Sequence, residues 1–493
     1  MQPDAVRPEP GAPVWRRLSP RMLLVHPVHE VLRQLPLLVG SVVLGSATNN
    51  PLWSLLGLAA IVVFGVARWF TTTYRIDAEE MRLRAGVLQR TVLSVPRNRI
   101  RSVQTDARPL HRLLGLTVLR VSTGQEAHGD KAFELDAVPT GDVPQLRAVL
   151  LAQSRVEAPQ PADIGVVLAR WQPSWLRYSP LSMSGLVMIT AAAGLIYQAG
   201  LGQVLQRSAV VESGLDAAQH FGVAASAAAA AVVVLVASVA LSVGRSLLTY
   251  GNLVLRRHGD TLHLQHGLVR VREHTFDMTR LRGGTVREPL LVRAFGGARL
   301  DAVMTGVNGA GEASLLLPPC PAATAHGVLE NLIGDNGVVT APVRGHGPAA
   351  ARRRWTRGLV LPGLAGVGLC AGALTVGVPA WSWWVLAVLT VGCALLAADR
   401  VRALGHRIDG AWLVSRSGSV ERRRDCIATA GIIGWTVRQS PLQRRAGVAT
   451  LIAATAAGTK RYVVIDVPAE QAWAVAAQAS PWVAQSIWAT PGM

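Results

Sequence analysis

One stretch occurs three times in this chain, and it constrains the fold more than any other feature. The first copy runs from Tyr74 to Gly124, and the others follow at offsets of 181 and 332 residues. Each copy has a glycine, an aliphatic residue and an R-x-x-G motif at matching positions: Gly86, Ile100, Arg112 and Gly115; Gly267, Leu281, Arg293 and Gly296; Gly418, Ile432, Arg444 and Gly447. Self-similarity at fixed offsets indicates a repeated structural unit.

The first copy has the pattern of a small α+β unit. Met81, Leu83 and Ala85 alternate with arginines, which is typical of a half-buried strand. Gly86 turns the chain, and Pro96 ends the next strand. Further strands are expected at residues 116–123 and 133–138, followed by a helix after Asp142 and Pro144. Several strands followed by one helix define the unit.

These motifs resemble a known family. The pattern is Gly86, Arg90, Pro96, Arg99, Ile100, Val103, Arg112, Gly115, Leu116, Thr123 and Gly124. It is similar to the bacterial pleckstrin-homology-like (bPH2, DUF304) domain of membrane-flanked domain proteins of the YdbS/YdbT type. The second copy lacks the proline, and the third has Gly431, Ile432 and Ile433 in place of the arginines. The resemblance is therefore closest in the first copy.

The resemblance implies a fold and a biological setting, but little chemistry. It implies a curved, two-sheet barrel or sandwich closed by a C-terminal helix, and most members of the family have no assigned activity. It also implies a small companion membrane protein with one such domain. A role in envelope stress or in tolerance of membrane-active peptides belongs to the same resemblance.

Apolar residues are concentrated in blocks that precede each copy. Half of the chain is hydrophobic, and the mean hydropathy is +0.32. A membrane-spanning helix needs about 20 apolar residues, and six blocks approach or reach that length, the first being short. They form three pairs: Leu35–Thr48 with Leu52–Phe70, Leu181–Leu201 with Phe221–Val243, and Leu359–Val378 with Trp381–Ala398. The predicted unit is a transmembrane hairpin followed by a PH-like domain.

The predicted fold class is a membrane protein of α-helical transmembrane hairpins and α+β domains. Three PH-like β-barrel or sandwich domains are expected, each closed by a C-terminal helix. The predicted segments are an N-terminal segment (1–34), hairpin 1 (35–70), domain 1 (71–156), a linker or interfacial segment (157–180), hairpin 2 (181–244), domain 2 (245–338), a linker (339–356), hairpin 3 (357–399) and a divergent domain 3 (400–493).

Arginine placement predicts the orientation. Basic residues are enriched on the cytoplasmic side of membrane spans, and here they flank the apolar blocks, whereas the hairpin tips contain only Arg207. Both termini and all three copies are therefore expected in the cytoplasm, in a multi-pass protein of the bacterial plasma membrane. Trp381, Trp383 and Trp384 lie beside the third tip, as expected for an outer interfacial belt.

The charge balance is strongly basic. The formal net charge is +19, and 47 of the 49 basic residues are arginines. Because these arginines flank apolar blocks, anionic lipid headgroups suit them better than nucleic acid. The alternative explanation of the arginine excess is that the arginines fix the membrane topology and reflect a bias in the composition of the genome.

Little in the sequence predicts catalysis or metal binding. The four cysteines have no C-x-x-C spacing, and His263 and His266 fall on opposite faces of an expected strand, so no metal site is predicted. No nucleotide-binding or nucleophile motif occurs, and no cofactor is expected. Gly368 and Gly372, within an apolar block, have the spacing of helix packing.

The strongest candidate for a binding surface is a ridge of arginines. If residues 97–103 are extended, alternation places three arginines on one face, and the second copy repeats part of the pattern. The candidate anion- or lipid-facing residues are Arg97, Arg99, Arg101, Arg280 and Arg282. The alternative is that they pair with the domain's own acids, such as Asp77, Glu79 and Glu80, or are solvated.

Two functions follow from these observations. The favoured one is a non-enzymatic membrane protein that presents three PH-like domains at the inner leaflet and binds or scaffolds lipid, itself or a partner protein. The alternative is a transporter or exporter component, or a membrane enzyme with a hidden site. The scarcity of charged residues inside the apolar blocks weighs against the alternative, because such residues mark transport pathways.

Overall fold

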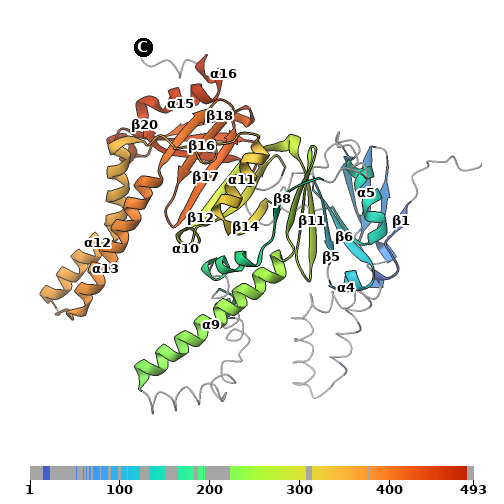
Figure 1. Cartoon of the computed structure of the whole chain (residues 1–493), viewed down its shortest axis with the longest axis horizontal. Helices are drawn as coiled ribbons and strands as arrows, with labels where there is room; N and C mark the ends of the chain where they lie inside the picture. Colours follow the sequence, from blue (N-terminus) through green and yellow to red (C-terminus); the bar gives the residue numbers. More distant parts are fainter. Residues whose placement is uncertain are drawn as a thin grey trace, which may run out of the picture. The chain divides into compact units, whose positions relative to one another are not determined.

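The computed structural model describes residues 15–22, most of 66–122, 133–151, 165–182 and 222–485 except 307–313 and 376, with isolated positions in 52–65 and 187–194. The chain forms two compact units (Figure 1). Unit 1 contains residues 1–170 and 251–279, and unit 2 contains residues 171–250 and 280–493. The boundary runs through the second copy, so that copy's strands are divided between the units.

The first copy, in unit 1, contributes one antiparallel sheet, three strands of a second sheet and two helices. One sheet has the order β1-β2-β3-β4, and β7-β6-β5 belong to the other. The elements are β1 (Arg16–Arg17), β2 (Thr73–Ile76), β3 (Glu80–Ala85), β4 (Thr91–Pro96), β5 (Ser102–Ala107), α4 (Pro109–Leu113), β6 (Leu116–Ser122), β7 (Phe133–Pro139) and α5 (Val143–Leu151). Met81, Leu119, Leu135 and Leu150 are fully buried in one core that both sheets and α5 share.

The second sheet of the first copy does not end with that copy. Strand β5 pairs antiparallel with β11 of the second copy, giving a seven-stranded sheet of order β7-β6-β5-β11-β10-β9-β8. The second-copy strands in this sheet are β8 (Val166–Arg170), β9 (Val254–His258), β10 (Thr261–His266) and β11 (Val271–Asp277). The first and second copies are therefore joined by a continuous sheet.

Unit 2 repeats this arrangement between the second and third copies. Strand β12 pairs with β17 in a six-stranded sheet of order β14-β13-β12-β17-β16-β15, and β18-β19-β20 form a separate sheet. The strands are β12 (Leu281–Pro289), β13 (Gly297–Met304), β14 (Leu315–Pro321), β15 (Gly405–Asp409), β16 (Trp412–Ser417), β17 (Glu421–Ala428), β18 (Ile432–Arg438), β19 (Val448–Thr455) and β20 (Arg461–Pro468). The helices after β14 and β20 are α11 (Ala322–Ile333), α15 (Ala472–Ala479) and α16 (Pro481–Ala484).

The offsets found in the sequence recur in the structure. Helices α4, α10 (Leu290–Ala294) and α14 (Pro441–Arg445) begin 181 and 332 residues apart, and each is closed by its predicted glycine. Gly115, Gly296 and Gly447 all have positive φ, between 64° and 73°, which glycine adopts without strain. Ile432 is buried and begins β18, whereas its counterpart Leu281 begins β12 and is only half-buried. Ile100 lies outside the described residues.

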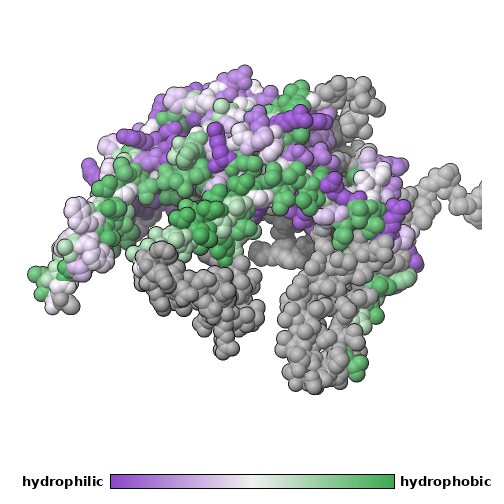
Figure 2. Space-filling model, turned by 60° about the horizontal axis from the view of Figure 1, so that its bottom comes forward, coloured by the Kyte–Doolittle hydropathy of each residue, from purple (hydrophilic) through white to green (hydrophobic). Residues whose placement is uncertain are grey.

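Three described helices are long and apolar enough to cross a membrane. They are α9 (Val223–Tyr250), α12 (Gly347–Thr375) and α13 (Trp381–Ala403), and they correspond to the second helix of hairpin 2 and both helices of hairpin 3. The other three predicted spans fall mostly outside the described residues. Green and pale residues, rather than purple ones, cover the end of the α12–α13 pair that projects away from the sheets (Figure 2). This surface is suited to lipid.

The glycine at which α12 and α13 approach each other is Gly358, and not Gly368 or Gly372, whose spacing predicted helix packing. A Cβ at Gly358 would lie 2.8 Å from the Cβ of Ala397 on α13, whereas a Cβ at Gly368 would meet nothing within 4 Å. The close approach is therefore at the base of the hairpin. At Gly372 a Cβ would lie 3.3 Å from Val378, so this glycine allows the chain to turn near the tip.

Each hairpin begins and ends on the same sheet. The strand before hairpin 2, β8, pairs with β9 after it, and Arg344 before hairpin 3 forms a bridge with His406 after it. In the same way β1 pairs with β2 on either side of residues 18–72. The predicted linkers therefore contain structure: β1 lies in 1–34, β8 in 157–180, and α12 begins within 339–356.

Candidate functional site

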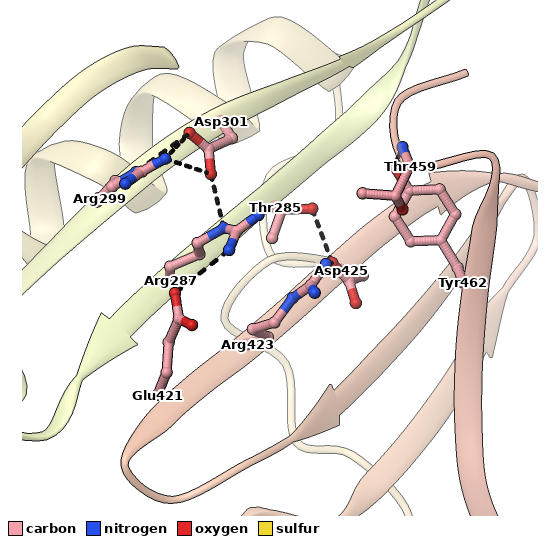
Figure 3. A network of polar contacts seen from close by, with 9 residues as sticks. All are labelled: Thr285, Arg287, Arg299, Asp301, Glu421, Arg423, Asp425, Thr459 and Tyr462. Carbon is pink, nitrogen blue, oxygen red and sulfur yellow. Dashed lines mark hydrogen bonds and ion pairs between the residues drawn. The ribbon is translucent and has the colours of Figure 1, made fainter. Parts of the chain in front are cut away.

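The junction between the second and third copies carries a network of ion pairs (Figure 3). Arg287 on β12 lies between Asp301 of its own copy and Glu421 of the next. Its Nε is 2.7 Å from Asp301 Oδ2, and its Nη1 is 3.3 Å from Glu421 Oε1. Arg299 Nη2 also contacts Asp301 Oδ1, at 3.0 Å. One guanidinium therefore connects the two copies across the shared sheet.

The electrostatics of this network favour the charged form of Arg287. Burial lowers the pKa of the Arg287 guanidinium, but the carboxylates of Asp301 and Glu421 outweigh burial, and the pKa is raised. Beside it, Thr285 Oγ1 donates to Asp425 Oδ1 at 2.7 Å, and Asp425 also pairs with Arg423 at 3.2 Å. Because the charges are matched, the network suits a structural joint better than a ligand site.

The junction in unit 1 uses the same kinds of contact. Arg270 in the β10–β11 turn pairs with Asp106 on β5, with Nε 2.6 Å from Oδ1. Thr105 Oγ1 donates to Glu273 Oε2 at 3.3 Å. The R-x-x-G arginine of the first copy, Arg112, donates from Nη1 to the carbonyl oxygen of Leu268 at 3.1 Å. Polar contacts therefore cross both internal junctions.

A buried carboxylate connects α12 to the third copy. Asp466 on β20 is fully buried and pairs with Arg353 and Arg354, the latter with Nη2 2.7 Å from Oδ2. Gln443 Nε2 donates to Asp466 Oδ1 at 2.8 Å. Asp466 has φ of +58°, a conformation that aspartate adopts more readily than most residues. The base of α12 is thus held to β20 and α14.

A second carboxylate connects α13 to two copies. Asp399, in the last turns of α13, accepts from Arg293 Nη2 at 2.8 Å and from Arg422 Nη2 at 2.7 Å. Arg293 is the R-x-x-G arginine of the second copy, and Arg422 lies on β17 of the third. Both helices of hairpin 3 are therefore ion-paired to the domains at their bases.

Two histidines join the same base to the core of the third copy. His346 Nδ1 lies 2.7 Å from the carbonyl oxygen of Ile465, so it donates, and His346 Nε2 lies 2.8 Å from His406 Nδ1. Burial lowers the pKa of both imidazoles, and for His406, with His346 and Arg344 adding positive charge nearby, it falls to about 4. The pair is neutral at pH 7.

Of the predicted arginine ridge in the first copy, the structure describes only Arg97. Arg97 is 8% exposed, and its Nη1 donates to the carbonyl oxygen of Asp77 at 3.4 Å. Its backbone N–H donates to Glu79 O at 2.8 Å. Arg97 follows β4 directly and lies against the acidic turn, so this side chain is not exposed, and a lipid-facing role of the other arginines stays a prediction. Arg99 and Arg101 lie outside the described residues.

In the second copy, the structure describes both predicted arginines. Arg280 ends a 3-10 turn, Met278–Arg280, and both it and Arg282 are half-buried. A Cβ at Gly431 would lie 2.9 Å from the Cδ of Arg282, so Arg282 packs on the third copy. This contact gives a physical reason for the glycine there. Arg280 and Arg282 thus lie near the junction rather than on an extended exposed face.

No metal cluster of three or more His, Cys, Asp or Glu residues occurs among the described residues. His263 lies between two threonine hydroxyls, 3.2 Å from Thr261 and 3.1 Å from Thr275. Burial raises the pKa of the Cys320 and Cys426 thiols to about 12, so they stay protonated.

Sequence reasoning missed Asp399 and Asp466, the two acids that hold hairpin 3. Asp399 could have been noticed as the acid that ends the last apolar block beside Arg400. Asp466 gives no such local signal, because its partners Arg353 and Arg354 lie on the far side of the hairpin in the sequence.

The fold and the membrane-proximal contacts define a membrane protein built on PH-like sheets, and comparison with known families agrees. Residues 31–154 and 359–481 match the model of the bacterial PH domain, bPH_2. The match covers half of the chain, which belongs to this family. The chain is also similar to the UPF0699 transmembrane protein YdbT of Bacillus subtilis (strain 168), with 21% identity over 263 residues.

That alignment covers 50% of this chain and 52% of the relative, so the chain spans about half the length of that curated protein. No solved structure matches the chain. The resemblance drawn from the repeat is therefore confirmed, and the chain is a bacterial membrane protein with PH domains.

Proposed function

We propose that this chain is a non-enzymatic membrane scaffold that holds its PH-like copies against the inner leaflet of the plasma membrane. The observation that carries the proposal is the attachment of the hairpins. The strand before a hairpin pairs with the strand after it, and both helices of hairpin 3 are ion-paired at their bases. Such attachment restricts how far a domain can turn away from the membrane.

Anionic lipid is the ligand class that suits the bases of the hairpins. Arg352 and Arg357 on α12 are exposed, and Arg402 on α13 is exposed as well. Each arginine close to an anionic leaflet contributes about 1 kcal/mol to membrane attraction. This proposal places the lipid contact at the bases of α12 and α13 rather than on the predicted ridge. The small companion membrane protein implied by the resemblance remains a proposed partner.

Lipid retention in nanodiscs tests this role. The full chain would be reconstituted in a mixture of phosphatidylglycerol and phosphatidylcholine, and retained lipid counted by native mass spectrometry. We expect Arg352→Glu with Arg357→Glu to reduce the retained phosphatidylglycerol at least twofold. The matched control is Lys460→Glu with Arg461→Glu, which reverses two exposed charges at the start of β20. Equal retention in both variants would contradict the lipid proposal.

A further inference from the structure

The two internal junctions use one register. In unit 1, Ser102 pairs with Phe276, and in unit 2, Gly283 pairs with Ile427. The two pairs can be compared in the numbering of the first copy, by subtracting 181 from second-copy numbers and 332 from third-copy numbers. In that numbering, position 102 lies opposite position 95 in both junctions. Two junctions with different sequences therefore share one alignment, which indicates that the pairing is a property of the repeat.

The two strand positions that pair at the internal junctions have no partner strand at the two ends of the array, in the part of the chain that the structure describes. Strand β18 of the third copy is equivalent to β5 and β12, and β4 of the first copy is equivalent to β11 and β17. Within the described residues, β4 and β18 are edge strands, with no partner on their outer sides. Strand β20 is also an edge, but so are its counterparts β7 and β14, so an unpaired strand at that position is normal for the repeat. By contrast, the counterparts of β4 and β18 in the other copies are paired.

Exposure agrees with this difference. Thr285 on β12 is 3% exposed, while its counterpart on β18, Thr436, is exposed. On β4, Val92 is 55% exposed, and its counterpart on β11, Glu273, is half-buried. The R-x-x-G arginine of the third copy, Arg444, is likewise exposed, although Arg112 contacts the second copy and Arg293 contacts Asp399 on α13.

The sequences of the two edges lack charged guard residues, and the bulge between Ile432 and Gly434 of β18 has a counterpart between Leu281 and Gly283 of β12, a strand that is paired at its junction. Exposed edges are commonly guarded by lysines, inward charges or bulges. Residues 91–95 read Thr-Val-Leu-Ser-Val, and residues 433–437 read Ile-Gly-Trp-Thr-Val, with no charge in either run. Pro96 ends β4 immediately after the stretch that the shared register would use, so the proline does not interrupt pairing.

We propose that β18 of one chain pairs with β4 of a second copy of this chain, joining chains head to tail in the register of the internal junctions. The shared register places Gly434 opposite Val95, Thr436 opposite Leu93 and Arg438 opposite Thr91. The contact joins different surfaces, so it can propagate from chain to chain. Confinement to one membrane favours it by raising the effective concentration.

Disulfide trapping in membranes tests the register directly. The background is the full chain with Cys370→Ala and Cys393→Ala, since the remaining Cys320 and Cys426 are buried. A chain with Thr436→Cys and one tag is co-expressed with a chain that has Leu93→Cys and a second tag. We expect a disulfide-linked dimer carrying both tags, and a ladder of oligomers when one chain carries both cysteines. Arg438→Cys with Thr91→Cys, both exposed, gives the same readout without touching the core.

Two controls make the result interpretable. Gln104→Cys with His274→Cys is the equivalent pair at the first internal junction and must form a disulfide within one chain. Thr436→Cys with Val92→Cys places the second cysteine on the opposite face of β4, and we expect at least tenfold less dimer.

The proposal is overturned if both in-register pairs give no more dimer than the off-register pair while the internal control forms. Disulfides confined to single chains would also overturn it. The inference builds on the proposed scaffold role, and the outcomes can be separated, because phosphatidylglycerol retention is measured on the hairpin arginines and does not depend on chain assembly.

Discussion

Single residues at the base of hairpin 3 have the largest expected effects. Asp466→Asn keeps the shape of the side chain but leaves the cations of Arg353 and Arg354 buried without a carboxylate. Removing one partner of a buried ion pair costs about 3–5 kcal/mol. Thermal unfolding of the purified protein should show a markedly lower midpoint.

The matched control is Asp409→Asn. Asp409 is 45% exposed and pairs with the partly exposed Arg407, and exposed pairs contribute about 0–1 kcal/mol. If Asp466→Asn lowers the unfolding midpoint no more than Asp409→Asn does, the stabilising role assigned to the buried carboxylate of Asp466 is wrong.

The imidazole of His406 predicts a pH dependence of stability. Its pKa is about 4 in the folded protein because of burial and because His346 and Arg344 lie nearby. Arg354 and Asp466 are the other charged groups that face the pair. In the unfolded chain this imidazole takes up a proton near pH 6.5. The stabilising contribution of the neutral, buried His406 is therefore complete above pH 6.5 and is lost as the pH falls toward 4.

The lowering of the His406 pKa corresponds to about 3 kcal/mol in the free energy of unfolding. His406→Gln should therefore show a shallower loss of stability between pH 6.5 and 4, measured by urea unfolding at several pH values. His274, whose pKa is also lowered to about 4 by burial, contributes equally to both proteins and cancels in the difference. Parallel pH profiles for the variant and the parent would exclude the assigned role of His406.

At the scale of elements, the packing of α12 on α13 depends on one glycine. A methyl group at Gly358 would lie 2.8 Å from Ala397, so Gly358→Ala must separate the helices and should lower the unfolding midpoint. Gly368→Ala adds the same methyl group where nothing lies within 4 Å, and it should have a neutral or stabilising effect. Equal effects of the two substitutions would contradict the assigned packing.

The elements also show what the sequence could predict. The repeat offsets located α4, α10 and α14, and alternation located β3, because both signals are local. The sequence pattern predicts a linker where β8 lies, because the partner strand β9 lies beyond a complete hairpin. The burial of Arg97 could not be read from strand alternation, because its partners Asp77 and Glu79 lie in an earlier turn of the chain.

At the scale of the whole molecule, membrane spans and repeated PH-like copies were predictable, whereas the way the copies join was not. The pairing of β5 with β11, and of β12 with β17, connects edge strands of different copies. Alternation indicates which strands have a buried face, but it does not say which edge meets which. The ion pairs at the joints, such as Arg287 with Glu421, are likewise long-range and have no motif.

We propose that the hairpins cross the membrane and hold the PH-like copies on its inner side. The most direct test of this proposal is labelling of intact cells with an impermeant thiol reagent, using the full chain with Cys370→Ala and Cys393→Ala. A cysteine at Pro379, in the tip of hairpin 3, should be labelled. A cysteine at Arg461, exposed on the third copy, should react only after the cells are permeabilised. Labelling of the Arg461 variant on intact cells, with the Pro379 variant protected, would contradict the account.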